Sequence, residues 1–95
     1  MAAYIIFDVE VTDPTKVSEY HQLATESMAS FKSKIIAYSE KVEILAGDWK
    51  PKALVMVEFE SMEQAREWYK SPAYTEAKDI LQKIASVKVI LVEGV

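Results

Sequence analysis

The fold of this chain is decided near its start by residues 4–11, YIIFDVEV. Most of these residues are β-branched or aromatic, and apolar positions recur at every second residue, as they do in a β-strand. One face consists of Ile5, Phe7, Val9 and Val11, and the other of Tyr4, Ile6, Asp8 and Glu10. The stretch therefore predicts a first strand whose fully apolar face joins a core.

A helix is predicted directly after this strand. Asp13 suits the N-cap position and Pro14 the first helical position. Apolar residues then recur at steps of three and four, which predicts one buried stripe on a helix that runs to about Phe31. The stripe consists of Val17, Tyr20, Ala24, Met28 and Phe31.

The rest of the chain predicts further strands and a second helix. We expect a second strand over residues 34–45, a turn at residues 47–51 and a third strand over residues 53–60. Ser61 and Gln64 form a capping box at the start of the next helix, and Pro72 divides that helix into two segments. A last strand over residues 86–93 completes the order β-α-β-β-α-β, which is the ferredoxin-like pattern.

The predicted fold class is therefore α+β, with a four-stranded antiparallel sheet and helices on one face only. The other face would be polar in a monomer. Here it is apolar whichever side the later strands present, over roughly several hundred Å². The first strand contributes Tyr4 and Ile6 to this face. The third strand adds either Leu54 and Met56 or Val55 and Val57, and the last strand adds either Ile90 and Val92 or Val89 and Leu91. The sequence therefore predicts a homodimer that pairs through the open sheet face.

Composition narrows the function classes. The 95 residues have room for one domain, residues 1–95, and the net charge of −4 argues against a nucleic-acid partner. With no cysteine and one histidine, the chain holds no thiolate or histidine-rich metal site. The two glycines lie too far apart for a phosphate-binding loop, and no cofactor is expected. No segment resembles a signal peptide or a membrane span, so we expect a cytoplasmic protein without a membrane partner.

Five stretches spread over the whole chain carry a family resemblance. They are residues 4–14, 42–51 (VEILAGDWKP), 57–65 (VEFESMEQA), 68–74 (WYKSPAY) and 92–95 (VEGV). In this order they resemble the family called domain of unknown function 1330. The resemblance implies a dimeric α/β barrel, in which ferredoxin-like chains pair through the open sheet face. That superfamily includes small monooxygenases, isomerases and dehalogenase-like proteins, but the family itself implies no established activity.

The chain departs from the family pattern at three places. Relatives often carry a basic residue where Asp8 stands, an arginine and a glycine where Tyr38 and Ser39 stand, and an arginine where Leu81 and Gln82 stand. If those basic residues bind an acidic ligand in relatives, this chain has lost that site or binds a different ligand.

His21 and Tyr38 are the first candidates for chemistry. His21 is the only histidine and lies beside the buried stripe, where it can act as an acid or base in a pocket between helix and sheet. Tyr38 lies on a strand expected near the sheet edge and can donate a hydrogen bond to a ligand oxygen. The alternatives are a partly exposed histidine without a role and a tyrosine at the subunit interface.

Asp8 and Glu58 interrupt two apolar strands that should be neighbours. If the two carboxylates lie close together, their repulsion would favour a shared proton and create an acid–base pair. The alternative is ion pairing with Lys34, Lys41 or Lys88 across the interface.

Three aromatic residues are candidates for ligand binding. Trp49, in the predicted turn, can cover a pocket or pack on a partner subunit. Trp68 and Tyr69 can form an aromatic ligand site or simply pack the second helix against the sheet.

Two functions remain open from the sequence. The first is a small homodimeric protein with a small-molecule pocket and no defined activity. The alternative is a cofactor-independent oxygenase or isomerase that acts on a small hydrophobic or enolic metabolite. An enclosed pocket into which His21 or Tyr38 points would favour the enzyme, whereas a solid core around them would favour a non-catalytic interaction module.

Overall fold

The computed structural model describes residues 1–95, which form four strands and three α-helices. The strands are β1 (Ala3–Val11), β2 (Ser33–Ser39), β3 (Ala53–Phe59) and β4 (Ala85–Glu93). They form one antiparallel sheet in the order β2-β3-β1-β4, so β1 and β3 are central and β2 and β4 are edges. The predicted α+β, ferredoxin-like fold is confirmed.

The first helical segment begins where the sequence predicts it. Asp13 is the N-cap, and its carboxylate accepts from the backbone N–H of Thr15 at 3.1 Å and from the Thr15 hydroxyl at 2.6 Å. The first turn is a short 3₁₀ segment, η1 (Pro14–Lys16), and α1 (Val17–Met28) follows it. The helix thus ends at Met28, about one turn before the predicted end at Phe31.

Two serines determine where the next helices begin and end. The hydroxyl of Ser61 accepts from the backbone N–H of Gln64 at 3.2 Å at the start of α2 (Met62–Lys70). Ser71 ends α2 and is also the N-cap of α3 (Pro72–Ile84). The break follows from Pro72, which lacks an N–H and disfavours helical geometry in the residue before it.

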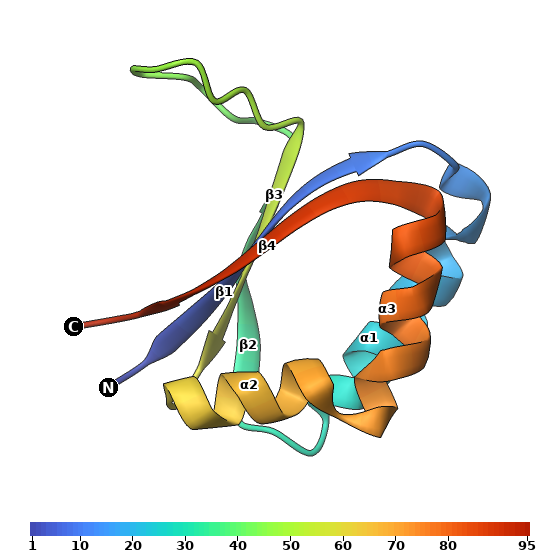
Figure 1. Cartoon of the computed structure of the whole chain (residues 1–95), viewed down its shortest axis with the longest axis vertical. Helices are drawn as coiled ribbons and strands as arrows, with labels where there is room; N and C mark the ends of the chain where they lie inside the picture. The colour runs from blue at the N-terminus through green and yellow to red at the C-terminus, as the bar shows by residue number, and fades with distance from the viewer.

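All three α-helices lie on one side of the sheet (Figure 1). The register pairs Ile6 with Met56 on β3 and with Ile90 on β4, and neighbouring residues across a ladder share a face. The register therefore settles which residues of β3 and β4 share the face away from the helices with Tyr4 and Ile6. We call this face the open sheet face, and its apolar members are Tyr4, Ile6, Leu54, Met56, Ile90 and Val92.

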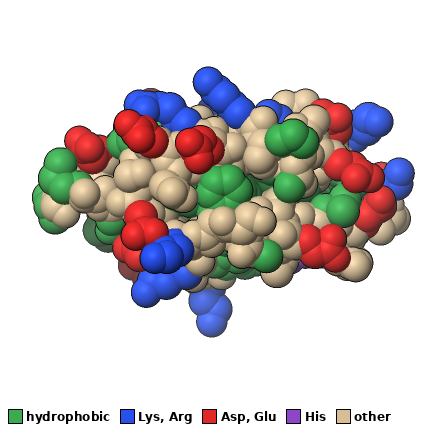
Figure 2. All heavy atoms as spheres, turned by 90° about the horizontal axis from the view of Figure 1, so that it is seen from below, with side chains coloured by type: hydrophobic (Ala, Val, Ile, Leu, Met, Phe, Trp, Pro, Cys, Tyr) green, Lys and Arg blue, Asp and Glu red, His purple; other side chains and the backbone are tan.

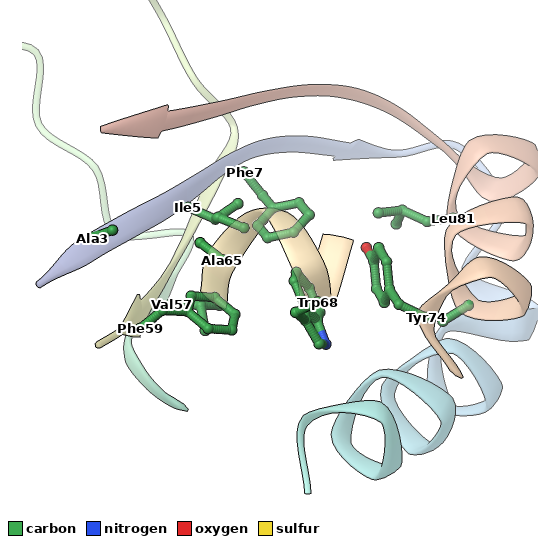
Figure 3. Packing of buried hydrophobic residues seen from close by; sticks show 10 residues of the cluster. Ala3, Ile5, Phe7, Val57, Phe59, Ala65, Trp68, Tyr74 and Leu81 are labelled. Atoms are coloured by element: carbon green, nitrogen blue, oxygen red, sulfur yellow. The ribbon is translucent and has the colours of Figure 1, made fainter. Parts of the chain in front are cut away.

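The closely packed part of the core lies between α2 and the sheet (Figure 3). Trp68 is 1% exposed, and its ring centre lies 4.1 Å from that of Tyr74 and 5.3 Å from that of Phe59. Its indole N–H donates to the Ser27 hydroxyl at 2.9 Å, and that hydroxyl donates to the carbonyl of Ala24 at 2.6 Å. Trp68 therefore joins α2 to α1 without leaving a buried donor unpaired.

The connection between β2 and β3 differs from the prediction. β2 ends at Ser39, after a register shift between Ile35 and Ala37, whereas the sequence predicted a strand to residue 45. Because β3 begins only at Ala53, residues 40–52 have no strand to pair with. They form an arm that extends away from the body of the molecule (Figure 1). Gly47, with φ +86°, provides the backbone geometry at its tip that other residues rarely adopt.

Charged side chains of both signs are mixed on the surface. Figure 2 shows one face on which acidic and basic groups alternate around the edge rather than gather by sign. No helix in the structure combines the length and the apolar character that a bilayer-crossing segment needs.

Candidate functional site

An inner pocket of about 280 Å³ lies between α1 and the sheet. Its floor is the helix-facing side of β1, β2 and β3, and its walls are α1 and parts of α2 and α3. Fifteen of its 18 lining residues are hydrophobic, and the other three are His21, Thr25 and Glu40. The pocket is therefore an apolar space with a small polar group at one side.

The pocket exists because α1 stands away from the sheet. The backbone of α1 lies close to α3 and approaches no strand to a similar extent. Consequently the predicted apolar stripe of α1 is half-buried rather than buried. Four of its five members line the pocket, namely Val17, Tyr20, Ala24 and Met28.

His21 and Tyr38 meet at the mouth of this pocket. The Tyr38 hydroxyl and His21 Nε2 are 2.6 Å apart, and the two rings meet edge to face at 72°. In the tautomer that carries its proton on Nδ1, His21 accepts this hydrogen bond from the phenol. Partial burial raises the pKa of the Tyr38 phenol, and the nearby Glu40 carboxylate raises it further. The pair thus places a neutral proton donor and a proton acceptor beside an apolar space.

Two phenols form a second hydrogen-bonded pair, and one of them, Tyr20, lines the pocket. The hydroxyls of Tyr20 and Tyr74 are 3.0 Å apart, and Tyr74 is completely buried. Burial raises the pKa of both phenols, and for Tyr74 the neighbouring Tyr20 raises it further. Both groups therefore stay protonated and act as a fixed neutral hydrogen bond between α1 and α3.

The structure brings some sequence candidates together and separates others. His21 and Tyr38, which the sequence proposed separately, are in direct contact, and Trp68 lines the same pocket from α2. Tyr69 does not line it. Its ring instead lies under the Lys78 ammonium, with Nζ 4.5 Å from the ring centre.

The expected pair of Asp8 and Glu58 is wrong. β1 and β3 are neighbours as predicted, but their register pairs Asp8 with Leu54 and Glu58 with Tyr4. The two carboxylates are therefore separated by about four residues along the ladder, or roughly 13 Å. Both also lie on the open sheet face rather than in the pocket. Neither has a salt bridge, although Lys34 is the cross-strand neighbour of Glu58.

Trp49 lies outside the inner pocket. Its indole N–H donates to Asp8 Oδ2 at 2.8 Å, which joins the arm to the open sheet face. Together they line a shallow, polar hollow with Lys50, Lys52 and Lys88. Trp49 is therefore placed beside the face expected to meet a partner, and not over the mouth of the pocket.

Sequence reasoning missed Glu40 as a pocket residue. The interpretation of residues 34–45 as one uninterrupted strand gave this carboxylate no special position. Its spacing of two from Tyr38 was the available signal, since alternate residues of an extended chain share a face. Thr25, one helical turn after His21, was missed although the i, i+4 spacing places the two on one side of α1. No group of three or more acidic, histidine or cysteine side chains comes together as a metal site would require.

The model of the family described as "Domain of unknown function (DUF1330)" matches residues 2–95. The chain belongs to this family. The resemblance of the five sequence stretches to this family is thus confirmed. Membership of the family defines no activity. A search of curated protein sequences finds no match.

Solved structures with the same fold resemble this DUF1330 chain. A protein of unknown function from Rhodopseudomonas palustris has a TM-score of 0.75 at 15% identity, covering 99% of this chain and 82% of that one. A dimeric ferredoxin-like protein of unknown function from Jannaschia sp. has a TM-score of 0.72 at 8% identity, covering 99% and 100%. SnoaB, a cofactor-independent oxygenase from Streptomyces nogalater, has a TM-score of 0.59 at 12% identity, covering 99% and 91%. At these identities the likeness establishes the fold alone.

Proposed function

We propose that this DUF1330 chain binds a small, largely apolar molecule in the inner pocket. The observation that carries the proposal is an apolar space that ends at the hydrogen-bonded pair of His21 and Tyr38. Pockets of this kind use apolar walls for affinity and a few polar groups for orientation. Tyr38 is 55% exposed, so the polar pair lies where a ligand would enter.

The volume of the pocket limits the size of the ligand. A cavity of about 150 Å³ holds one benzene molecule, so a space of 280 Å³ suits roughly ten to twelve non-hydrogen atoms. That size matches a bicyclic aromatic or a short substituted phenyl compound. The ligand would lie against Val9, Val55 and Met28 and direct its polar group toward Tyr38.

A panel of neutral aromatic alcohols and carbonyl compounds tests this proposal by thermal shift and ligand-observed NMR. We expect binding to wild type and its loss in Ala24→Leu, since the added methyl groups enter the pocket. Gln22→Leu, which adds the same side chain on the exposed side of α1, should bind like wild type. Failure of every compound to bind, or equal binding to Ala24→Leu, would overturn the proposal.

We further propose that the working unit is a homodimer joined through the open sheet face. The support is the open sheet face, on which six apolar residues are neighbours and Ile90 and Val92 are 57% and 44% exposed. Contiguous exposed apolar surface of this kind marks interaction sites. Related folds of this kind include proteins described as dimeric, from Jannaschia sp. and Thermobifida fusca. We also propose, as the sequence predicts, that this homodimer is located in the cytoplasm.

Light scattering at micromolar concentration tests the dimer. Wild type should have the mass of two chains, and Ile90→Glu should have the mass of one, because a buried carboxylate without a partner opposes pairing. Leu45→Glu places the same charge on an apolar arm residue that is 91% exposed and should leave the mass unchanged. A single-chain mass for wild type would contradict the proposal.

The second candidate function is a cofactor-independent oxygenase or isomerase. It is favoured by the proton acceptor His21 and proton donor Tyr38 in an apolar pocket, and by the fold shared with the oxygenase SnoaB. In an isomerisation, His21 Nε2 would take a proton from the ligand and return it to another atom, so that no oxidant is needed. Deuterium exchange into a bound enolisable ligand would detect this step, and oxygen uptake would detect the oxygenase. His21→Gln should remove either signal while the ligand still binds.

A further inference from the structure

The only formal charge among the side chains that line the inner pocket, His21 aside, is negative. Its lining contains no lysine, arginine or aspartate, and the carboxylate of Glu40 is its one formally negative side chain. Five lysines adjoin lining residues in the sequence, but all five are exposed and none lines the pocket: Lys16, Lys34, Lys41, Lys52 and Lys83. A ligand inside the pocket therefore meets no fixed positive charge.

The backbone does not replace the missing cation. β1 and β3, which form most of the floor, are paired with strands on both sides, so their N–H groups are already used in the ladders. The wall formed by α1 presents its side chains and not the start of the helix, apart from Val17. An anion in the pocket would thus lose its hydration without gaining a charged or backbone partner.

The polar pair suits neutral groups instead. In one tautomer of His21, Tyr38 gives its proton to Nε2 and keeps an oxygen lone pair that can accept from a ligand hydroxyl. In the other tautomer, His21 donates to the phenol oxygen, and the Tyr38 O–H is free to donate to a ligand carbonyl. Both of these arrangements, in which the imidazole is neutral, satisfy a neutral ligand and provide no full positive charge. Only the protonated imidazole, in which both ring nitrogens donate, would place a positive charge here.

We propose that the pocket selects by charge, accepting neutral hydroxyl, carbonyl or amide compounds and rejecting carboxylates of the same shape. This inference rests on the proposed small-molecule pocket and specifies the class of its ligand. Two features act together: the lining contains no lysine or arginine, and Glu40 repels an anion that approaches the mouth. The chain therefore differs in ligand class from any pocket that uses an arginine or lysine to hold an acid.

An isosteric pair of compounds tests the selection. trans-Cinnamamide and trans-cinnamate have the same size and shape, but only the second is charged at neutral pH. We expect isothermal titration calorimetry on the wild-type protein to give at least tenfold tighter binding of the amide. Equal affinities for the two compounds would overturn the charge selection and leave the pocket itself intact.

Two charge-reversal variants locate the effect. Glu40→Lys should raise the affinity for cinnamate relative to cinnamamide by about three- to tenfold, since it replaces the repelling charge with an attracting one at a partly solvated site. Glu43→Lys changes the net charge equally but lies on the exposed arm outside the pocket, so it should leave the ratio within about twofold of wild type. An equal change in both variants would show a general charge effect and contradict the proposal.

Failure of the pocket is distinguishable from failure of the selection. If neither compound binds wild type or Glu40→Lys, and the neutral panel also fails, the small-molecule function is overturned together with its charge selection. If the amide binds wild type and Ala24→Leu alike, binding takes place elsewhere, which also contradicts both. Tighter binding of cinnamate than of cinnamamide by wild type would contradict the selection alone.

Discussion

The core beneath α2 and the core beneath α1 are built from similar residues but packed to different extents. Beneath α2, Trp68 fills the space between Phe59 and Tyr74, and Ala65 is completely buried (Figure 3). Beneath α1, the apolar side chains of the helix and Val55 of β3 are only half-buried and border a pocket. The difference shows that one half of a small core can be closely packed while the other half leaves an open space, which is where we propose that a ligand binds.

The reason for this difference lies in the position of each helix. α2 lies close to β1, β3 and β4, whereas α1 lies close to α3 instead. The bond from Trp68 to Ser27 and the bond between Tyr20 and Tyr74 hold α1 at that position. Polar pairs of this kind fix a separation that apolar contacts alone would tend to close, because apolar burial has no preferred direction.

The largest expected effect is a loss of stability when the closely packed half of the core is disrupted. Trp68→Ala should lower the free energy of unfolding by about 3–5 kcal/mol, because it removes a large buried ring and leaves a cavity among rigid neighbours. Met28→Ala, on the wall of the pocket, should lower it by only about 1–2 kcal/mol, since its side chain is half-buried beside existing empty space. Urea denaturation measures both.

Trp49→Ala is the matched control for this prediction. Trp49 has the same side chain as Trp68 but is 56% exposed, so its removal should change the free energy of unfolding by at most about 1 kcal/mol. If Met28→Ala destabilises the protein as much as Trp68→Ala, the two halves are equally packed and the comparison fails.

Most of the fold was predictable from the sequence, because period and capping are local signals. The alternation in residues 4–11 and the caps at Asp13 and Ser61 defined the first strand and the helix starts. The early end of β2 was not predictable, since residues 40–45 are apolar enough for a strand but have no partner to pair with. A strand requires a neighbour, and sequence pattern alone does not reveal where that neighbour begins.

The candidate site was predictable only in part. The spacing of Tyr20, Ala24 and Met28 showed which side of α1 faces inward, but not how far α1 stands from the sheet. That distance depends on contacts between residues remote in sequence, such as Trp68 with Ser27. The separation of Asp8 and Glu58 likewise depends on strand register, which the two strand sequences did not specify.

The second prediction enlarges one alanine in each half. Ala65→Leu should lower the free energy of unfolding by about 1–3 kcal/mol, because Ala65 is completely buried and three more carbon atoms would displace its neighbours. Ala24→Leu should change it by less than about 1 kcal/mol, since the pocket accepts the added atoms and both sites are helical. Urea denaturation of the two variants compares them directly. Equal destabilisation by the two leucines would indicate that the space under α1 closes in solution.

The smallest effect concerns pH and distinguishes a buried phenol from an exposed one. Burial raises the pKa of Tyr74 above its usual value of 10.0, so the folded state holds this proton more tightly than the unfolded state. Its contribution to stability is therefore fully present below pH 10 and is lost as the pH rises toward the folded pKa. Tyr38, whose pKa is also raised but whose ring is 55% exposed, should contribute less to this loss.

Tyr74→Phe should therefore be less stable than wild type at pH 7, by about 1 kcal/mol, because the hydrogen bond to Tyr20 is lost. Above pH 10 the difference should shrink or reverse, because unfolding of wild type releases the Tyr74 proton and unfolding of the variant does not. The free energy of unfolding of the variant should therefore fall less steeply with pH, by the slope that corresponds to about one proton. Tyr38→Phe should keep nearly the wild-type slope. Denaturant unfolding at a series of pH values gives the slopes, and a parallel decline for wild type and Tyr74→Phe would mean that the phenol is as accessible as Tyr38 and that the helices around it are not closely packed.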